Sequence, residues 1–302
     1  MKTIPIESED HWRALRAKHV GSSEIAALFG LSPYTTPFAL WHDKAGSAAL
    51  PEPDNGRVDW GKLLEPAIAK GVSAEERWQL EARPVYCTAD DVEGMGCMVD
   101  FHIVDHERGP GLVECKNVDW LIWKHDWTET HAPPHIEIQV QHQFAVTGYP
   151  WGAIAVLVGG NDLHIYERTP HAETVARLKE RVAEFWQSIR ERHAPEPFGV
   201  AAELDTLRAI YSPPDPKERI DLTGSPAAFE AARMFAWARG EVAFHQKTAE
   251  DARAKLHALI GKAGEIVIPG FDIRRRKDGP IYRCEMLPGA EAPAEPAFES
   301  FL

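Results

Sequence analysis

The sequence is poor in cysteine and has no long apolar run. Its four cysteines, at positions 87, 97, 115 and 284, form no CxxC pair, which excludes a CxxC zinc centre and a dense disulfide framework. No apolar run approaches the roughly 20 residues that a membrane-spanning helix needs. The first eight residues lack the apolar segment of a secretion signal, so we expect no membrane association and a cytoplasmic location.

Basic residues are also under-represented, because 33 Lys and Arg face 46 Asp and Glu, for a formal net charge of -13. This balance argues against a protein that coats nucleic acid without specificity. It does not exclude an enzyme that gathers carboxylates around divalent cations, beside a narrow basic groove. The hydrophobic share of 44% and the charged share of 26% are ordinary for a soluble protein of one large or two small domains.

The spacing of apolar residues predicts helices and strands in an α/β order. Short helices are expected at 8–19, at 25–29 after an N-cap at Ser23, from Ser32 to Trp41, and at 63–78 with Pro66 in its first turn. Strands are expected at 85–87, 96–104, 112–116, 153–158 and 163–166, and further helices at 134–147 and 171–192. This order indicates an α/β fold with a central mixed sheet flanked by helices.

The remaining third of the chain has a different composition. Residues 195–224 are rich in proline and predict a linker or an extended strap. A long helix is expected at 225–262, as an oligomerisation or partner element, followed by a hairpin with strands at 265–268, 271–276 and 281–283 and a turn at 277–279. The Pro- and Glu-rich end from residue 288 is predicted to be disordered.

The residues with the clearest chemical meaning are Asp100, Glu114 and Lys116. Glu114 and Lys116 are two apart on a strand and therefore share a face, and Asp100 lies on the neighbouring strand of a predicted hairpin. Two carboxylates can hold a hard divalent cation, and a lysine can orient a water or stabilise developing negative charge. Phosphodiester hydrolysis needs this set of groups.

An ordinary ion pair at a strand edge is the alternative for these three residues, and their spacing alone favours it. The surroundings point the other way. Asp100 stands in an otherwise apolar stretch, where an unpaired carboxylate is costly, and Glu114 follows directly on Leu112 and Val113.

Four segments, in order, resemble the YqaJ-type phage recombinases, the lambda-exonuclease-like branch of the PD-(D/E)XK nucleases. The first runs from Arg16 through G-S-S-E-I-A at 21–26 and S-P-Y at 32–34, and continues as L-W at 40–41 and K-A-G at 44–46. The others are W-G-K-L-L-E-P-A-I at 60–68, the D…E-C-K set itself, and P-P at 133–134 with I-Q-V-Q-H-Q at 138–143 and V-T-G at 146–148. The resemblance covers roughly residues 10–192.

The resemblance implies roles for five residues at one site. Asp100 and Glu114 match the metal-binding carboxylates, with the backbone carbonyl of Cys115 completing the metal shell. Lys116 matches the catalytic lysine. Glu65 matches a helix carboxylate that binds a second metal or holds the lysine.

Three more positions follow from the same resemblance. Gln139 matches a glutamine beside the active centre, although it could also simply bond a backbone group. Arg16 and Ser23 match positions that hold the 5′-phosphate of a DNA end, where the amides of the following helix would favour an anion. The sequence departs from the pattern at Ile136, where a tyrosine is frequent, and His135 beside it is a speculative replacement.

The expected protein is a Mg²⁺-dependent DNA exonuclease, with Mn²⁺ as a substitute, acting 5′→3′ on double-stranded ends. It would prepare single strands for a phage annealing protein in a bacterial or phage-infected cell, as a homo-oligomer, trimeric in part of the family. The expected domains are a nuclease domain at 1–194, the linker at 195–224, an extension at 225–287 and the tail at 288–302. Open alternatives are an endonuclease, a single-strand nuclease, or a non-catalytic protein that binds DNA ends or a partner.

Two groups of residues have alternative interpretations. Trp120, Trp123 and Trp127 could stack on bases, but packing of a loop over the core is favoured. The basic run 274–277 could contact phosphates, but a solvated hairpin face is favoured.

Overall fold

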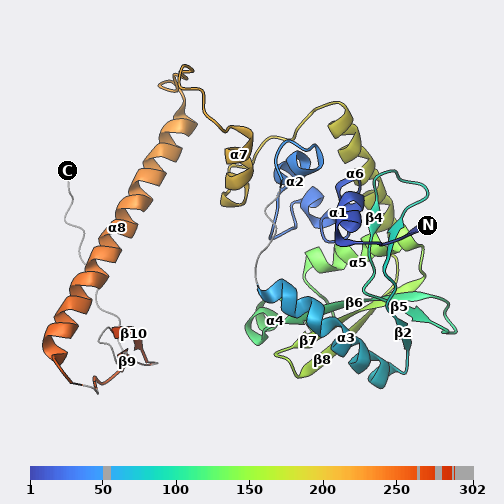
Figure 1. The fold of residues 1–302 in the computed structure, drawn as a ribbon, viewed down its shortest axis with the longest axis horizontal. Helices are drawn as coiled ribbons and strands as arrows, with labels where there is room; N and C mark the ends of the chain where they lie inside the picture. Colours follow the sequence, from blue (N-terminus) through green and yellow to red (C-terminus); the bar gives the residue numbers. More distant parts are fainter. Residues whose placement is uncertain (50–55, 264–265, 276–280, 288, 290–302) are drawn as a thin grey trace. The chain divides into compact units, whose positions relative to one another are not determined.

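A five-stranded mixed sheet forms the centre of residues 1–214 in the computed structural model (Figure 1). Its strand order is β2 (Gln79–Glu81), β5 (Phe101–Val104), β6 (Gly111–Val118), β7 (Trp151–Val158) and β8 (Asp162–Arg168). Only the β6–β7 pair of this sheet is parallel, because the helix α5 (Pro134–Thr147) lies in the connection between these two strands. The predicted mixed sheet with flanking helices is confirmed.

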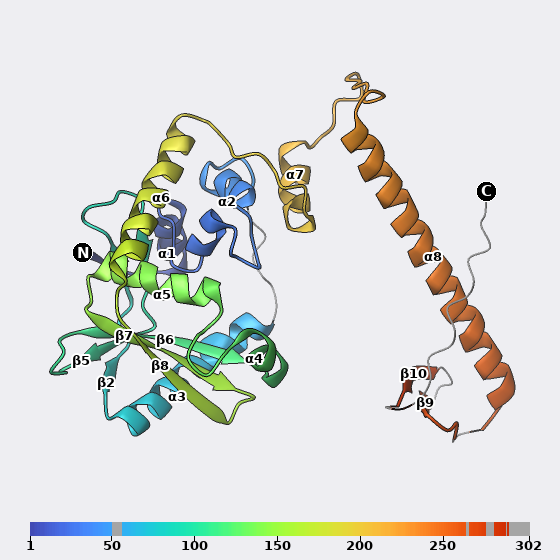
Figure 2. The same ribbon diagram turned by 180° about the vertical axis from the view of Figure 1, so that it is seen from behind.

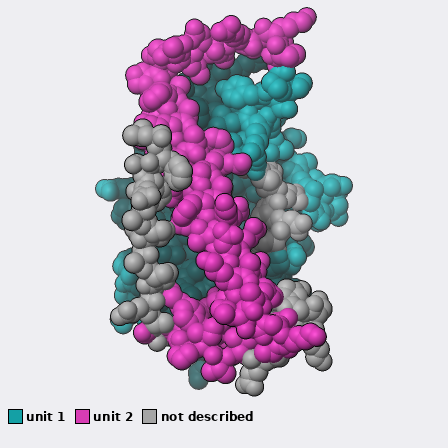
Figure 3. All heavy atoms as spheres, turned by 90° about the vertical axis from the view of Figure 1, so that its left-hand side faces the viewer, with its two compact units in different colours: residues 1–214 teal, residues 215–302 magenta. Residues whose placement is uncertain are grey.

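The structure describes residues 1–49, 56–263, 266–275, 281–287 and 289. It divides the chain into two compact units, 1–214 and 215–302, which Figure 3 colours separately.

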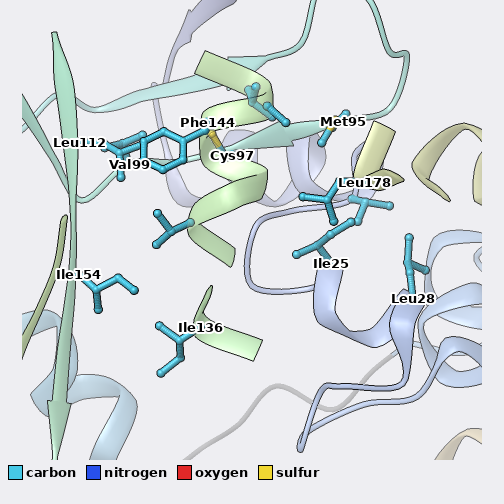
Figure 4. Close-up of a cluster of buried hydrophobic side chains, with 14 of the residues drawn as sticks. Ile25, Leu28, Met95, Cys97, Val99, Leu112, Ile136, Phe144, Ile154 and Leu178 are labelled. Carbon is cyan, nitrogen blue, oxygen red and sulfur yellow. The ribbon is translucent and has the colours of Figure 1, made fainter. Parts of the chain in front are cut away.

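Helices cover both faces of the central sheet (Figures 1 and 2). The helix α3 (Gly56–Glu76) packs through Ile68 and Val72 on the face that presents Val113 and Cys115. The helix α5 (Pro134–Thr147) covers the opposite face, and α6 (Ala172–Arg190) packs against α5. The apolar core between α5 and the sheet includes Phe144 of α5, which lies beside Leu112 of the sheet (Figure 4).

The predicted strand at 96–104 is wrong in one respect that matters for the site. It is two strands in two sheets, because β4 (Gly96–Cys97) pairs with β3 (Val85–Thr88) and β5 pairs with β6. A small three-stranded sheet contains β3, β4 and β1 (Lys2–Pro5). Asp100 therefore lies in the bend between the two sheets rather than within a strand.

The first predicted helix is confirmed as α1 (Glu9–Ala17), capped by Ser8, but the next two have other N-caps than predicted. Residues 25–29 form a 3₁₀ helix, and Glu24 rather than Ser23 occupies its N-cap. The helix α2 (Pro37–Lys44) is capped by Thr36, because the Ser32 hydroxyl accepts instead from the amides of a turn. Turn chemistry at a serine thus competes with helix capping.

Helix α3 begins before Leu63, so Pro66 lies inside the helix and not in its first turn. An internal proline removes one backbone hydrogen bond and costs a few kcal/mol, about 3. Burial of Ile68 and Val72 against the sheet holds the helix together across this position.

Several elements lie beyond the central sheet. The helix α4 (Trp120–Asp126) follows β6, and Ala201–Glu203 and α7 (Leu204–Ile210) are short helices within the stretch predicted as a linker. The second unit contains α8 (Pro226–Ile260), β9 (Phe271–Arg275) and β10 (Ile281–Met286), which confirms the predicted long helix and hairpin.

Other predictions for the second unit are wrong or fall outside the described residues. Residues 266–268 form no strand beyond an isolated bridge from Ile268 to Phe271. The predicted turn at 277–279 and the predicted tail from 288, apart from Gly289, lie outside the described residues. In the described part of the chain, no helix is both long and apolar enough to span a membrane.

Candidate active site

Glu114 is the centre of a buried polar cluster between the sheet and α5. Its side chain is 4% exposed, and three donors surround its carboxylate. Lys116 Nζ lies 2.6 Å and Gln139 Nε2 lies 2.5 Å from Oε1, and Gln143 Nε2 lies 2.6 Å from Oε2. Charged and amide donors on both oxygens hold the carboxylate in one orientation.

The alternation of β6 explains why these residues meet. Leu112 belongs to the core under α5, whereas Val113 and Cys115 belong to the core under α3. Glu114 and Lys116 therefore project toward α5. There they meet glutamines that are four residues apart and so share one face of the helix.

Asp100 joins the cluster through the register of the β5–β6 hairpin. Phe101 pairs with Val113, so Asp100 lies opposite Glu114. The Asp100 Oδ2 atom accepts a hydrogen bond of 2.8 Å from the backbone N–H of Cys115, which fixes the bend to β6. Burial, followed by the negative charge of Glu114, raises the pKa of Asp100 well above its usual value.

Glu65 reaches the same cluster from α3. Its backbone carbonyl lies 4.0 Å from the Cys115 Sγ atom, and its side chain is half-buried. Burial raises the pKa of Glu65, Glu114 raises it further, and Lys116 lowers it in part. The sequence-predicted residues Asp100, Glu65, Glu114, Lys116 and Gln139 are thus brought together.

The charges of this cluster do not balance. Burial works against the charge of Lys116, but Glu114 and then Asp100 raise its pKa, so the lysine is a cation at neutral pH. Three carboxylates and one ammonium, when ionised, sum to -2 (-3 + 1). A divalent cation with oxygen ligands fits this donor set and this charge. Within the described residues, no three His, Cys, Asp or Glu side chains close on one point, so a cation held here would also need a carbonyl, such as that of Cys115, or water as a ligand.

Comparison with known proteins relates this region to a family. Residues 11–150, just under half of the chain, match the model of the YqaJ-like viral recombinase domain. The whole cluster lies on the matched segment, and the predicted resemblance to this family is confirmed.

Individual relatives were also found. The chain is 28% identical over 221 residues to the uncharacterized protein YqaJ of Bacillus subtilis (strain 168), covering 72% of this chain and 68% of that protein. A solved alkaline exonuclease from Laribacter hongkongensis is 16% identical with a TM-score of 0.49, over 61% of this chain and 94% of that chain. The same enzyme in complex with dAMP is 19% identical with a TM-score of 0.48, over 62% of this chain and 94% of that chain.

Arg16 and Ser23 lie apart from the carboxylate cluster, with no contact to it among the described residues. Arg16 donates to Glu24 Oε1 at 2.7 Å, and Lys44 Nζ lies 2.8 Å from Glu24 Oε2. Ser23 is exposed beside them. Glu24 was not predicted as a functional residue. Its position in the sequence between Arg16 and Lys44 was the one feature that indicated an ion pair.

Position 136 is occupied by a core residue. Ile136 is buried among apolar side chains between α5 and the sheet (Figure 4). His135 beside it is half-buried, and burial and then the charge of Lys116 lower its pKa. Its ring meets the exposed ring of Tyr34 edge-on, at 6.1 Å between centroids.

Of the three tryptophans after β6, two pack against other rings and one is exposed. Trp123 and Trp127 pack with each other and with Tyr166, which confirms the favoured packing role. Trp120, in contrast, is 57% exposed at the start of α4.

Proposed function

We propose that this protein is a Mg²⁺-dependent deoxyribonuclease that digests double-stranded DNA from its ends, 5′→3′. The observation that carries the proposal is the buried Glu114, joined to Lys116 and placed opposite Asp100, in a cluster whose net charge is -2 when all of its groups are ionised. The match of residues 11–150 to a viral recombinase family supports DNA as the substrate.

Each residue of the cluster has a separate role in the proposed phosphodiester hydrolysis. Asp100 and Glu114, with Glu65 and the Cys115 carbonyl, would hold Mg²⁺ or Mn²⁺. When bound, the cation supplies polarisation of the phosphate and a lowered pKa of water. Lys116 presents its ammonium beside Glu114 and is the group that orients the attacking water or stabilises negative charge as it develops.

Gln139 has a supporting role in this proposal. Its amide donates to the same Glu114 oxygen as Lys116, and so it keeps the carboxylate and the ammonium in one orientation. Such restraint matters because misplacing a reacting group by about 1 Å can cost on the order of 10²-fold in rate.

Exposed aromatic rings near the cluster support a nucleic-acid substrate. Trp60 lies on α3, which also carries Glu65, and Trp120 follows β6 directly. Tyr34 is 80% exposed and contacts His135. Bases of a single strand stack on such rings, each with about 1–3 kcal/mol.

The 5′-phosphate of the DNA end is proposed to bind at Arg16 and Ser23. The Arg16 side chain remains 35% exposed while Glu24 holds one of its nitrogens, and Ser23 is exposed next to it. Digestion from the 5′ end would leave 3′ single strands as the substrate of an annealing protein. Size measurement in solution tests the expected homo-oligomer.

A digestion assay tests the proposed function. Linear, nicked and closed circular duplexes are incubated with Mg²⁺, with Mn²⁺ or with EDTA, and 5′- and 3′-labelled ends report the polarity. We expect only the linear duplex to be digested, from the 5′ end, and EDTA and Glu114→Gln to abolish the activity. Cleavage of closed circles would instead indicate an endonuclease. Tight binding of ends without cleavage by the wild type would indicate a DNA-end-binding protein.

A further inference from the structure

Gln143 connects the two segments that carry the candidate metal ligands. Its side chain is 1% exposed, and its amide nitrogen lies 2.6 Å from Glu114 Oε2 and 3.2 Å from the backbone carbonyl oxygen of Met98. Both partners are acceptors, so the amide must present its NH₂ group, and each hydrogen has one partner. One side chain thus spans from β6 to the chain two residues before Asp100.

We propose that Gln143 is a positioning residue that sets the distance between Asp100 and Glu114 for cation binding. This inference rests on the proposed function. Gln143 touches neither Asp100 nor the reacting atoms; it acts by holding the Met98 carbonyl, and so the Asp100 bend, against Glu114. A ligand separation fixed before the metal arrives lowers the cost of binding it.

The two carboxylate oxygens of Glu114 differ in their hydrogen-bond partners. Oε1 accepts from both Lys116 and Gln139, which uses the two acceptor positions of a carboxylate oxygen. Within the described part of the chain, Oε2 accepts only from Gln143, which leaves one acceptor position for a cation. Gln143 therefore orients the one oxygen of Glu114 that is able to bind metal.

Packing alone does not explain a glutamine at this position. The Oε1 atom of Gln143 is buried and finds no hydrogen-bond partner among the described residues. A buried acceptor without a partner opposes folding, and an apolar side chain of the same size would avoid this cost. A glutamine is therefore explained by the two hydrogen bonds that its NH₂ group donates, which an apolar side chain could not make.

Gln141 offers a matched control on the same helix. It also makes two hydrogen bonds, donating to the Thr169 carbonyl at 2.9 Å and accepting from the His171 amide at 2.8 Å. These bonds tie α5 to the start of α6 and do not involve the carboxylate cluster. Gln143→Met and Gln141→Met therefore remove equivalent groups, only one of which bridges the metal-binding segments.

The test measures metal binding without DNA and without turnover. Mn²⁺ is titrated calorimetrically into the full-length wild type, Gln143→Met and Gln141→Met, and thermal unfolding is recorded in EDTA. We expect Gln143→Met to weaken Mn²⁺ binding by about 10- to 100-fold while it remains folded in EDTA. Gln141→Met should bind Mn²⁺ like the wild type.

The outcomes separate this inference from the proposed function. Unchanged Mn²⁺ affinity in a folded Gln143→Met overturns the positioning role alone. Absence of Mn²⁺ binding by the wild type overturns the metal site and the proposed function with it. If Gln143→Met does not fold, Gln143→Asn provides the same measurement, because its amide is one methylene too short to bond both acceptors.

Discussion

Replacement of Lys116 by methionine separates catalysis from metal binding at the candidate site. The substitution keeps the length of the side chain but removes the ammonium that lies 2.6 Å from Glu114. The net charge of the ionised cluster changes from -2 to -3 (-2 - 1). We therefore expect metal binding to persist or tighten, while cleavage falls by about 10²- to 10³-fold because the group that stabilises developing charge is lost.

The stability cost of the same substitution follows from the geometry. Loss of one partner of a fully buried ion pair costs about 3–5 kcal/mol. The Lys116 side chain is 26% exposed, and Glu114 keeps two amide donors, so the expected cost is nearer that of one charged hydrogen bond, about 2 kcal/mol. A bound divalent cation offsets the excess negative charge, so the cost should shrink when Mg²⁺ is added.

Urea denaturation in EDTA and in Mg²⁺, together with digestion of linear duplex, measures these effects. Lys179→Met is the control, because Lys179 lies the same 2.6 Å from Asp91 and is 28% exposed, but its partner is 61% exposed. That pair should contribute less than about 1 kcal/mol and nothing to cleavage. Digestion within a few-fold of wild type by Lys116→Met would refute the assigned role of the lysine. Equal destabilisation by both substitutions would refute the burial argument.

Three further predictions concern residues outside the carboxylate cluster. Burial works to raise the pKa of Glu24, but the charges of Lys44 and then Arg16 outweigh it, so the pKa is lower in the folded protein than in the unfolded chain. The ionised Glu24 therefore stabilises the fold at a pH above the unfolded pKa, and this contribution is lost as the pH falls through the folded pKa. Glu24→Gln should therefore lower the urea midpoint at pH 7 and have less effect at acidic pH; an equal effect at both would contradict the argument. Ile136→Tyr should destabilise by about 1–3 kcal/mol and restore no activity, because position 136 is 6% exposed in the core; increased cleavage would show that the position reaches the site. Trp120→Ala should weaken single-strand binding in Ca²⁺ by about 1–3 kcal/mol in fluorescence anisotropy, with unchanged affinity arguing against base stacking.

Local patterns predicted the central sheet and most of the candidate site. In an antiparallel hairpin, each residue of one strand lies opposite a residue of the other strand. The approach of Asp100 to Glu114 was therefore predictable from two adjacent strands. The strand break before Asp100 was not, because it depends on β4 pairing with β3 in a second sheet. Glu65 and Gln139 came from the family resemblance rather than from any local pattern.

The residues that sequence analysis missed depend on contacts between distant segments. Glu24 bonds Arg16 nearby, but its second charged partner, Lys44, comes from the end of α2. Gln143 could have been found, because it follows Gln139 by four residues on one helical face. Its bond to the Met98 carbonyl needed the fold, since nothing in a sequence shows which backbone oxygen a buried amide meets.

The composition of α5 itself connects stability with function. A helix that only covered a sheet would bury apolar side chains, yet α5 also buries Gln139, His142, Gln143 and Thr147. Burial lowers the pKa of His142 to about 3, so this histidine is neutral, and the two glutamines direct their amides at one carboxylate. Sequences depart from apolar core packing where a site requires it. The polar face of α5 therefore gives up packing free energy to hold Glu114 in one orientation before any cation binds.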